Sequence, residues 1–527
     1  ISAEDIGKFP DTNLAEAMSR ITGVSIDRNS PGGPPGEGQR ITVRGIGPDF
    51  NLVLLNGRQM PSATIEDTGA SNSRAYDFSN LAAEAVSAVE VYKTSMANIP
   101  TGGIGATVNI RTARPLDIGE RSMSFGAKAV TDSSAQSSSW TPEVSGIYSD
   151  VFADGKFGIT LTGIYQDREF GYNQARIEQW RFCEGDDAGC WGGVPQPGAP
   201  GSEDVVNRPG PDDLYGIPQN LRYSLNDVKR ERLNGQLVLQ WQPIESVTAT
   251  LDYTYSELEI QTRRSETSSW FIFGASESSF TDGPIATPIT YTELKDDFAW
   301  DRVYDQAKYG QKTENDSLGF NLEWIARDNL AFALDWHSST AEIGKASPYG
   351  TNALLSAPAF HRGTSTVDLS QDFPVLTVAL PGGVMDPTTV LTGGFSFRDS
   401  YMKSEIDQLD LSGVFDFGEA QSLDFGLTFT EVNNRTAFGK NEDPAWGGVG
   451  SPDDYPDDLF QIRDISSAFD AIPGHNNPNL TDEMFIWDFD RMIPIASAAR
   501  NQYLGAPDAF TDDRRVKEET TSAYVQW

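Results

Sequence analysis

The stretch SVTATLDYTYS, residues 246–256, alternates between apolar and polar side chains without a break. One set of alternate positions is apolar, and the positions between them are Thr, Asp or Ser; the apolar set is Val247, Ala249, Leu251, Tyr253 and Tyr255. A β-strand repeats every two residues, so the pattern predicts a strand with one apolar face and one polar face.

The same alternation recurs in the part of the chain that follows residue 120. It is found in residues 235–241, 317–324, 329–337 and 422–430. Each run is about 8 to 12 residues long, which is the length of a tilted strand that crosses a bilayer. The runs therefore predict a set of membrane-crossing strands.

The connections between these runs are alternately short and long. Tight turns are expected at residues 153–155, 243–245, 327–329 and 418–420, and long polar loops at residues 170–222, 264–313, 344–400 and 438–515. This asymmetry is typical of an outer-membrane β-barrel. A soluble β-sandwich is the alternative, but its outward face would be polar and it would seldom need such long loops. We therefore predict a mainly β fold with an antiparallel transmembrane β-barrel.

Composition and charge exclude other classes. The chain has 527 residues, 38% of them hydrophobic, and no apolar run approaches the roughly 18 to 20 residues of a membrane-spanning helix. A net charge of −36 leaves no basic surface for nucleic acid. The acidic tracts at residues 184–189, 201–206 and 452–458 are interpreted as solvated surface, with calcium-binding loops as the alternative.

The two cysteines, Cys183 and Cys190, flank a short polar loop. We favour a disulfide over two free thiols, which places the loop in an oxidising compartment. The three histidines, His337, His361 and His475, are far apart in sequence, so no metal constellation is predicted. No nucleophile, base or metal cluster stands out, and we expect neither an enzyme nor a bound cofactor.

Residues 1–117 have a different pattern and predict a small α/β domain. Within it, IPTGGIGATVNIRT, residues 99–112, looks like a nucleotide-binding glycine loop. A dinucleotide loop needs a helix after the glycines, whereas residues 107–112 are β-branched and alternating. We therefore expect Gly102, Gly103 and Gly105 to form a tight turn between strands that contacts no ligand.

Four motifs of this domain closely resemble the plug domain of TonB-dependent outer-membrane receptors. They are ITGVSI, ITVRGIGPDFNLVLLNGRQMPS, VEVYKTS and GGIGATVNIRT, in that order and with matching spacing. The resemblance implies a plug at residues 1–117 inside a barrel, of which residues 118–527 are the N-terminal part. The wording around residues 10–28 and 91–117 looks most like a large subfamily associated with oligosaccharide uptake.

The resemblance also implies a function and partners. It implies active import of a scarce nutrient across the bacterial outer membrane, driven by TonB, which would contact a segment upstream of Ile1. We expect an oligosaccharide, because the acidic loops would repel an anionic iron complex; a ferric siderophore or other metal chelate is the alternative. Outer-membrane lipid, lipopolysaccharide and a surface lipoprotein are further expected partners.

A plug has to be held firmly and yet be removable, so polar contacts with the barrel suit it. Arg44, Arg58, Arg111 and Arg114 lie in or beside the resembling motifs, and the polar face of the predicted strands carries acids such as Asp252, Glu323, Asp335, Asp410 and Asp424. We expect Arg44 and Arg111 to pair with barrel carboxylates, since a planar guanidinium suits bidentate bonds. The alternative is that each pairs within the plug.

Substrate contacts are expected from outward-facing plug loops and from aromatic side chains of the long loops. Aromatic rings there could stack on a ligand, although such residues also occur in membrane girdles and loop cores. The candidates are Gln39, Ser62, Asn72, Arg74, Tyr76, Trp180, Trp191, Trp270 and Trp446.

The number of predicted strands departs from the family pattern. Plugged transporters of this kind have about 22 strands, whereas about ten are recognisable here. The last run, TTSAYVQW at residues 520–527, is itself an alternating strand. We therefore expect this chain to be the front part of a longer receptor.

Overall fold

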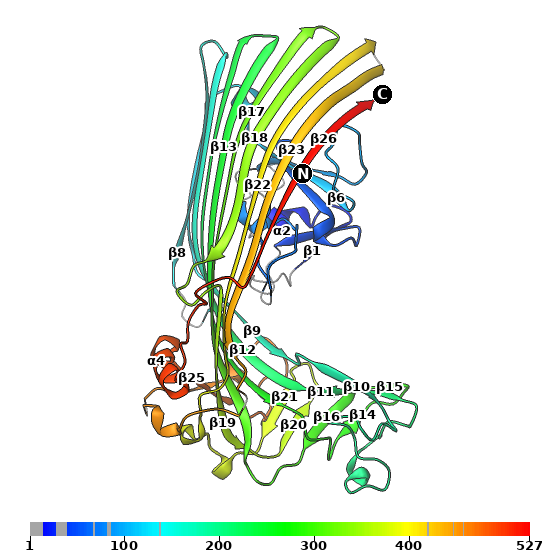
Figure 1. Ribbon diagram of the computed structural model, residues 1–527, viewed down its shortest axis with the longest axis vertical. Helices are drawn as coiled ribbons and strands as arrows, with labels where there is room; N and C mark the ends of the chain where they lie inside the picture. Colours follow the sequence, from blue (N-terminus) through cyan, green and yellow to red (C-terminus); the bar gives the residue numbers. More distant parts are fainter. Residues whose placement is uncertain are drawn as a thin grey trace.

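The structure is a computed structural model. It describes residues 14–27, 39–66, 69–81, 86–135, 139–418, 421–445, 447–456 and 458–527. None of the helices in these ranges has both the length and the apolar character needed to cross a membrane. The described residues form a curved sheet, a small unit on its concave side and a folded region at one end (Figure 1).

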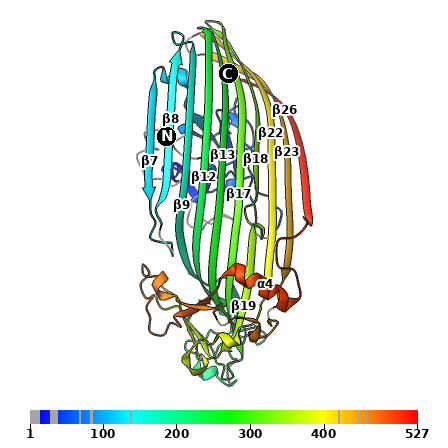
Figure 2. The same cartoon turned by 90° about the vertical axis from the view of Figure 1, so that its left-hand side faces the viewer.

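The curved sheet, here called the wall, consists of long antiparallel strands joined to their neighbours in sequence order (Figure 2). They are β7 (Ser122–Val130), β8 (Thr141–Phe152), β9 (Phe157–Arg176), β12 (Asn220–Ile244), β13 (Val247–Trp270), β17 (Trp300–Arg327), β18 (Leu330–Lys345), β22 (Phe395–Gly418), β23 (Gln421–Asp443) and β26 (Asp512–Gln526). A further strand, β19 (Asn352–Arg362), pairs with β17 and β22. Within the described ranges β7 and β26 are the two edges of this sheet.

The alternation predicted from the sequence is confirmed, but the strands are longer than predicted. β13 has 24 residues and β17 has 28, so both continue far beyond a bilayer crossing. On β13 the outward positions Leu251 and Tyr253 are exposed, whereas Thr250 and Asp252 are buried on the inner side. The outward apolar band therefore lies near the tight turns, where the wall faces lipid.

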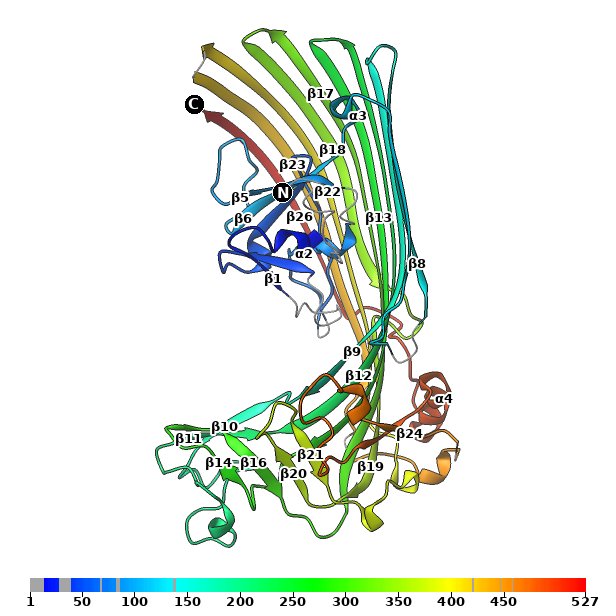
Figure 3. The same cartoon turned by 180° about the vertical axis from the view of Figure 1, so that it is seen from behind.

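The unit on the concave side of the wall, here called the plug, is built by the N-terminal residues (Figure 3). Its main sheet has the order β4-β3-β6-β5, and a second sheet pairs β1 with β2. The elements are α2 (Leu14–Met18), β1 (Val24–Asp27), β2 (Arg40–Val43), β3 (Asn51–Leu55), β4 (Arg58–Gln59), β5 (Val86–Tyr92), β6 (Ala106–Thr112) and, leading to the wall, α3 (Pro115–Ile118). Leu14, Met18, Val53, Val108 and Ile110 are among its buried core side chains.

The glycine stretch is a turn inside the plug, as predicted. Strand β6 begins at Ala106 immediately after it and runs parallel to β3. The Gly105 N–H donates to the Phe50 carbonyl at 2.9 Å, and a Cβ at Gly105 would lie 2.6 Å from Asn51 Oδ1. Only glycine allows this close approach, so the stretch shapes the plug and is followed by no helix that could hold a phosphate.

The expected long polar loops are a folded region instead, here called the cap: the described residues of 177–219, 271–299, 363–394 and 444–511. Its elements are β10 (Trp180–Glu184), β11 (Leu214–Pro218), β14 (Ser279–Phe280), β15 (Ile285–Ala286), β16 (Pro288–Glu293), β20 (Ser365–Asp368), β21 (Val375–Val378), β24 (Gln461–Asp464), β25 (Glu483–Ile486) and α4 (Phe489–Arg500). Tyr215, Phe280, Tyr291 and Phe373 are buried in one core that spans these segments. The polar composition concealed this core because its apolar residues are scattered and follow no strand or helix period.

Candidate functional site

A tight hairpin carries Arg58 from the plug to the wall. Between β3 and β4, Asn56 and Gly57 have φ values of 55° and 88°. A two-residue turn with positive φ at both positions is the one that Asn-Gly favours, and its twist matches the flanking strands. The turn directs the next residue, Arg58, out of the plug toward the polar face of the wall.

Arg58 is held between two carboxylates of the wall, the buried Asp252 and the partly exposed Asp335, and we call this group the clamp. Its Nη1 lies 2.7 Å from Asp252 Oδ2 on β13, and its Nε lies 2.6 Å from Asp335 Oδ1 on β18. A second bond runs from Nη2 to Asp335 Oδ2 at 3.1 Å, so the Asp335 contact is bidentate. Arg58 and Asp252 are each only 4% exposed, so water does not screen this pair.

The wall leaves room for this guanidinium by placing a glycine between the two acids. Gly319 of β17 lies opposite Asp252, and a Cβ at Gly319 would come within 1.6 Å of Arg58 Nη1. Asn321, two residues further along β17, donates to Asp335 Oδ2 at 3.0 Å. The clamp therefore depends on a strand position that accepts no side chain.

Several other contacts between plug and wall are also polar, beside one apolar cluster in which Ala63 and Ile65 of the plug pack against the wall. Arg114 of the plug lies 3.6 Å from Glu323, and the Leu116 N–H donates to Gln240 Oε1 at 2.9 Å. Asn234 of β12 donates to the Asn80 carbonyl at 2.8 Å. Hydrogen bonds and ion pairs thus carry much of this interface, which suits a unit that is held and released.

The expectation that Arg44 and Arg111 anchor the plug is wrong. Arg44 Nη2 donates to the Gly105 carbonyl at 3.0 Å, and Arg111 Nη1 lies 3.2 Å from Glu90 Oε1. Both partners belong to the plug, because Arg44 turns back over the glycine stretch and Arg111 lies across the sheet from Glu90. Arg58 and Arg114 instead make the wall contacts that were expected of Arg44 and Arg111. The Asn-Gly pair before Arg58 was a sequence signal that could have pointed to Arg58.

A cavity of about 300 Å³ opens between the plug and strands β22, β23 and β26. The plug contributes four of the predicted substrate residues to its lining, namely Ser62, Asn72, Arg74 and Tyr76. The wall contributes Met402, Ser404, Asn434, Arg514 and Glu518, among others. The structure therefore brings one part of the predicted set together at one place.

The chemistry of this cavity is polar and partly basic. Arg514 Nη1 donates to Asn72 Oδ1 at 3.1 Å and so connects wall and plug across the cavity. Arg74 is exposed, and no ion pair joins its guanidinium to a carboxylate within the described ranges. Tyr76 also lines the cavity, and its ring packs against that of Phe78 with the ring centroids 5.0 Å apart. Burial raises the pKa of the Tyr76 hydroxyl well above the usual value.

Gln39 does not belong to this cavity. It is buried, its carbonyl accepts a bond from the Phe78 N–H at 2.8 Å, and it lines a separate space of about 20 Å³. That space is large enough for little more than one water molecule. Gln39 is therefore placed as a structural residue, contrary to the prediction.

The predicted tryptophans separate into different places. Trp180 and Trp270 lie at the ends of strands β10 and β13, where the Arg222 guanidinium is 5.5 Å from the Trp270 ring centroid. Trp191 directly follows Cys190, and the Arg181 guanidinium lies 4.5 Å from its ring centroid. Trp446 lies outside the described residues.

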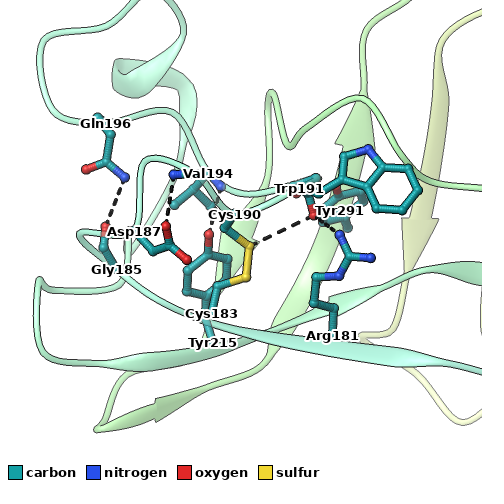
Figure 4. The surroundings of a disulfide bond; sticks show 12 residues. Arg181, Cys183, Gly185, Asp187, Cys190, Trp191, Val194, Gln196, Tyr215 and Tyr291 are labelled. Carbon is teal, nitrogen blue, oxygen red and sulfur yellow. Dashed lines mark hydrogen bonds between the residues drawn. A yellow bond between two sulfur atoms is a disulfide. The ribbon is translucent and has the colours of Figure 1, made fainter.

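Cys183 and Cys190 form the predicted disulfide, with their Cα atoms 6.1 Å apart (Figure 4). Next to it, the Val194 N–H donates to the Tyr215 hydroxyl at 3.0 Å, and the Tyr291 hydroxyl donates to the Gly192 carbonyl at 2.7 Å. The disulfide and these buried hydroxyls fix the loop on the cap core.

The calcium hypothesis has no site in the part of the chain that the structure describes. There, one group of three metal-ligand side chains occurs, formed by Cys183, Asp187 and Cys190. Both thiols are consumed by the disulfide, which leaves a single carboxylate. The acidic tracts fit solvated surface better than an ion site.

Comparison with known proteins gives one family and several relatives. Residues 1–107 match the TonB-dependent receptor plug domain. The ferric enterobactin receptor PirA of Pseudomonas aeruginosa is 35% identical over 121 residues, which are 22% of this chain and 16% of that protein. The ferrienterobactin receptor of Escherichia coli is 29% identical over 118 residues, which are 22% of this chain and 16% of that protein. These matches therefore span 16% of the length of each curated relative.

Among solved structures, the siderophore receptor PirA from Acinetobacter baumannii is similar to this chain. The two share 12% identity with a TM-score of 0.33, over 100% of this chain and 90% of that one.

Proposed function

We propose that this chain, whose plug and wall are those of a TonB-dependent receptor of the bacterial outer membrane, takes up an anionic iron chelate. The observation that carries the proposal is the clamp, in which one plug arginine bridges a buried and a partly exposed carboxylate of the wall. Such a contact is strong while it is made and leaves both units folded when it is broken. It suits a plug that is displaced by a pulling force.

The pulling force would come from TonB acting on a segment upstream of the described residues. Strand β6 runs parallel to β3 in the centre of the plug sheet, and Arg58 follows β3 directly after the tight turn. A load on the N-terminal part would therefore reach Arg58 through β3 and its tight turn.

The cavity chemistry and the relatives both favour an iron chelate over the oligosaccharide expected from the sequence. Arg74 gives the cavity an exposed positive group although the whole chain carries a net charge of −36, and Arg514 lines it as well while its guanidinium pairs with Asp512 at 2.6 Å. An anionic complex would gain charge-assisted bonds from such groups. The relatives matched through the plug are named as receptors for ferric enterobactin.

Uptake of radioactive iron tests the proposal. Iron-starved cells that lack their own receptors would produce this protein in the outer membrane, with and without TonB. We expect uptake of a ferric catecholate complex only when both proteins are present. Arg74→Ala with Arg514→Ala should reduce uptake at least tenfold, because two charge-assisted contacts are lost.

The matched control is Arg111→Ala, which removes an arginine that is paired inside the plug. It should leave uptake within twofold of the parent. Uptake that is unaffected by the loss of TonB, or growth on oligosaccharides with no transport of any iron chelate, would contradict the proposal.

A further inference from the structure

A buried histidine of the wall lies beside the clamp. His337 of β18 is fully buried, and it lies two residues from Asp335 on the same face of the strand. Its Nε2 is 3.1 Å from the Gln59 carbonyl, and Gln59 directly follows Arg58 in the plug. A carbonyl oxygen only accepts, so the Nε2–H donates and the neutral ring carries its one proton there. The contact with the plug therefore fixes the tautomer of this histidine.

The other ring nitrogen of His337, Nδ1, is buried and makes no hydrogen bond with any described residue. A buried acceptor without a partner costs free energy, so such an atom in a folded protein needs an explanation. The contact with the plug is already satisfied through Nε2. Nδ1 is thus an unused site for a proton, and a proton there would make the ring a second cation beside Arg58.

The strand register places His337 at the edge of the gap that the Arg58 guanidinium fills. Three positions lie directly opposite one another across β13, β17 and β18, namely Asp252, Gly319 and His337. The outer two contact the plug, and the guanidinium lies where a side chain at Gly319 would be. Directly opposed residues are about 5 Å apart, so one position without a side chain separates His337 from Asp252. When Arg58 leaves, the space over Gly319 becomes open to the histidine ring.

The charges around His337 favour one cation in this gap and disfavour two. Arg58 is the positive group beside the ring. The acids around the ring lie on β13, β18 and β22, and they are Asp252, Asp335, Asp407 and Asp410. While Arg58 is bound, a proton on Nδ1 would add a second positive charge at a buried position, which Coulomb repulsion opposes. Once Arg58 has left, the same acids attract that proton.

We propose that His337 binds one proton when the clamp opens and so replaces the positive charge of Arg58 in the gap. The proton comes from water that enters beside the displaced plug, binds at Nδ1, and returns to water when Arg58 moves back. The charged ring turns over Gly319 toward the carboxylates, which then keep a cation while the plug is away. The inference rests on the proposed function, in which the plug is displaced, and adds a proton-binding step to it. His337 is a positioning residue in this step, because it acts through the clamp and contacts no chelate.

The pH dependence of plug retention tests this step. The clamped protein has a neutral His337 and the released one has a charged His337, so release should become easier as the pH falls. The purified protein would be treated with a protease at a series of pH values from about 8 to about 5.5, and cleavage within the plug would be followed. An unfolded reference peptide corrects for the pH profile of the protease itself. We expect the corrected cleavage rate to rise roughly tenfold over this range.

The variant His337→Gln separates the histidine from the acids around it. Its amide N–H can still donate to the Gln59 carbonyl, but the side chain binds no proton. The rise in cleavage should therefore disappear, while cleavage at about pH 8 stays within twofold of the parent. The matched control is His361→Gln, because His361 is also buried but bonds Tyr304 instead of the plug; it should keep the full rise. A rise that persists in His337→Gln would overturn the inference and assign the pH dependence to the clamp carboxylates.

Direct observation of the proton makes the test independent of proteolysis. The chain has three histidines, so the purified protein with isotope-labelled histidine gives few NMR signals, and the one that His337→Gln removes belongs to His337. In Arg58→Ala this signal should titrate at a pH roughly one to two units higher than in the parent, because a cation is lost and the acids remain. The same titration in both proteins would contradict the inference.

The outcomes distinguish this inference from the proposed function, because neither measurement requires TonB or an iron chelate. If the pH dependence survives in His337→Gln, or if the histidine signal does not respond to Arg58→Ala, His337 is not the proton site. That result leaves TonB-driven iron uptake intact. If cells take up no iron chelate at all, the proposed function fails, whereas the titration of His337 still decides whether the ring binds the proton.

Discussion

The clamp lies on the inner face of the wall, and so does a second group of charged side chains, here called the cap-end cluster. The cluster consists of Arg176, Glu178, Arg222, Arg264 and Glu266. The clamp and the cluster differ in where their arginines come from. In the clamp, Arg58 belongs to the plug, and its partners Asp252 and Asp335 belong to the wall. In the cap-end cluster, Arg222 and its partner Glu266 are neighbours within the wall itself. The same chemistry therefore joins two units in one place and stiffens a single unit in the other.

This difference separates a contact that has to be released when the plug moves from a contact that stays in place within the wall. Breaking a buried ion pair leaves an uncompensated charge. The free-energy cost depends on whether each charged side chain can then become hydrated. The halves of the clamp can separate with their own units, so the charge becomes solvated when the plug moves. The cap-end arginines stay beside their carboxylates when the plug moves, because both partners belong to the wall side of the molecule. The clamp is thus suited to release, and the cap-end cluster to holding neighbouring strands of one unit together.

The largest effect is expected from Arg58→Ala, which breaks the clamp and leaves Asp252 and Asp335 side by side without a cation. We expect a loss of about 3–5 kcal/mol in the free energy that holds the plug against the wall. Protease cleavage of the plug in the purified protein and entry of large antibiotics into producing cells would both increase. These measurements report on the plug without requiring the wall to unfold.

The control for this variant is Arg111→Ala, whose partner Glu90 lies in the plug and whose side chain is half exposed. An exposed pair of this kind contributes under about 1 kcal/mol, so plug release should hardly change. Equal effects of the two variants would abolish the distinction between contacts that join units and contacts within one.

Gly319→Ala disturbs the clamp by a change in the wall, and we expect a somewhat smaller loss of plug retention than for Arg58→Ala. The new methyl group would overlap Arg58 Nη1, so the guanidinium has to leave at least one carboxylate. We expect a loss of roughly 2–4 kcal/mol in plug retention, measured by the same protease assay. Gly235→Ala is a matched wall glycine with open space around its Cβ position and should be nearly silent.

The wall was readable from sequence because its signal is local. In residues 246–256, the face of the sheet on which a side chain lies follows from its position in the alternating pattern, and β13 keeps this alternation in the structure. The cap was not readable, since Tyr215, Phe280 and Phe373 meet only after distant segments come together. Residues 264–313 therefore appeared as one long loop, although they hold several short strands and the start of β17.

For the contact between plug and wall, the sequence predicted the residue types correctly but not which side chains face the wall. Arginine and aspartate were the right partners for the plug contact, but the sequence did not show which arginines face the wall. Ser62, Asn72 and Arg74 reached one cavity because they follow one another in one plug loop.

The third prediction concerns the cap alone. Cys183→Ser with Cys190→Ser removes a loop closure and should destabilise the cap by roughly 2–3 kcal/mol. We expect faster proteolysis between residues 184 and 213. The clamp should be untouched, so plug retention is the internal control. Loss of plug retention in this variant would contradict the separation of the two regions.

The smallest effect is the pH dependence that Asp305 gives to the cap end. Burial, with Glu266 nearby, raises its pKa to about 6 in the folded protein, above the usual value of 3.8. The folded state then binds the proton more tightly than the unfolded state, so this stabilisation is complete below pH 4 and is lost as the pH rises through 6. Asp305→Asn should remove a slope of roughly 2 kcal/mol between pH 4 and 6.5 from the unfolding free energy, measured by urea titration. Asp328→Asn, at a tight turn far from this cluster, should leave the slope unchanged, and an unchanged slope in Asp305→Asn as well would show that Asp305 is ionised beside Glu266.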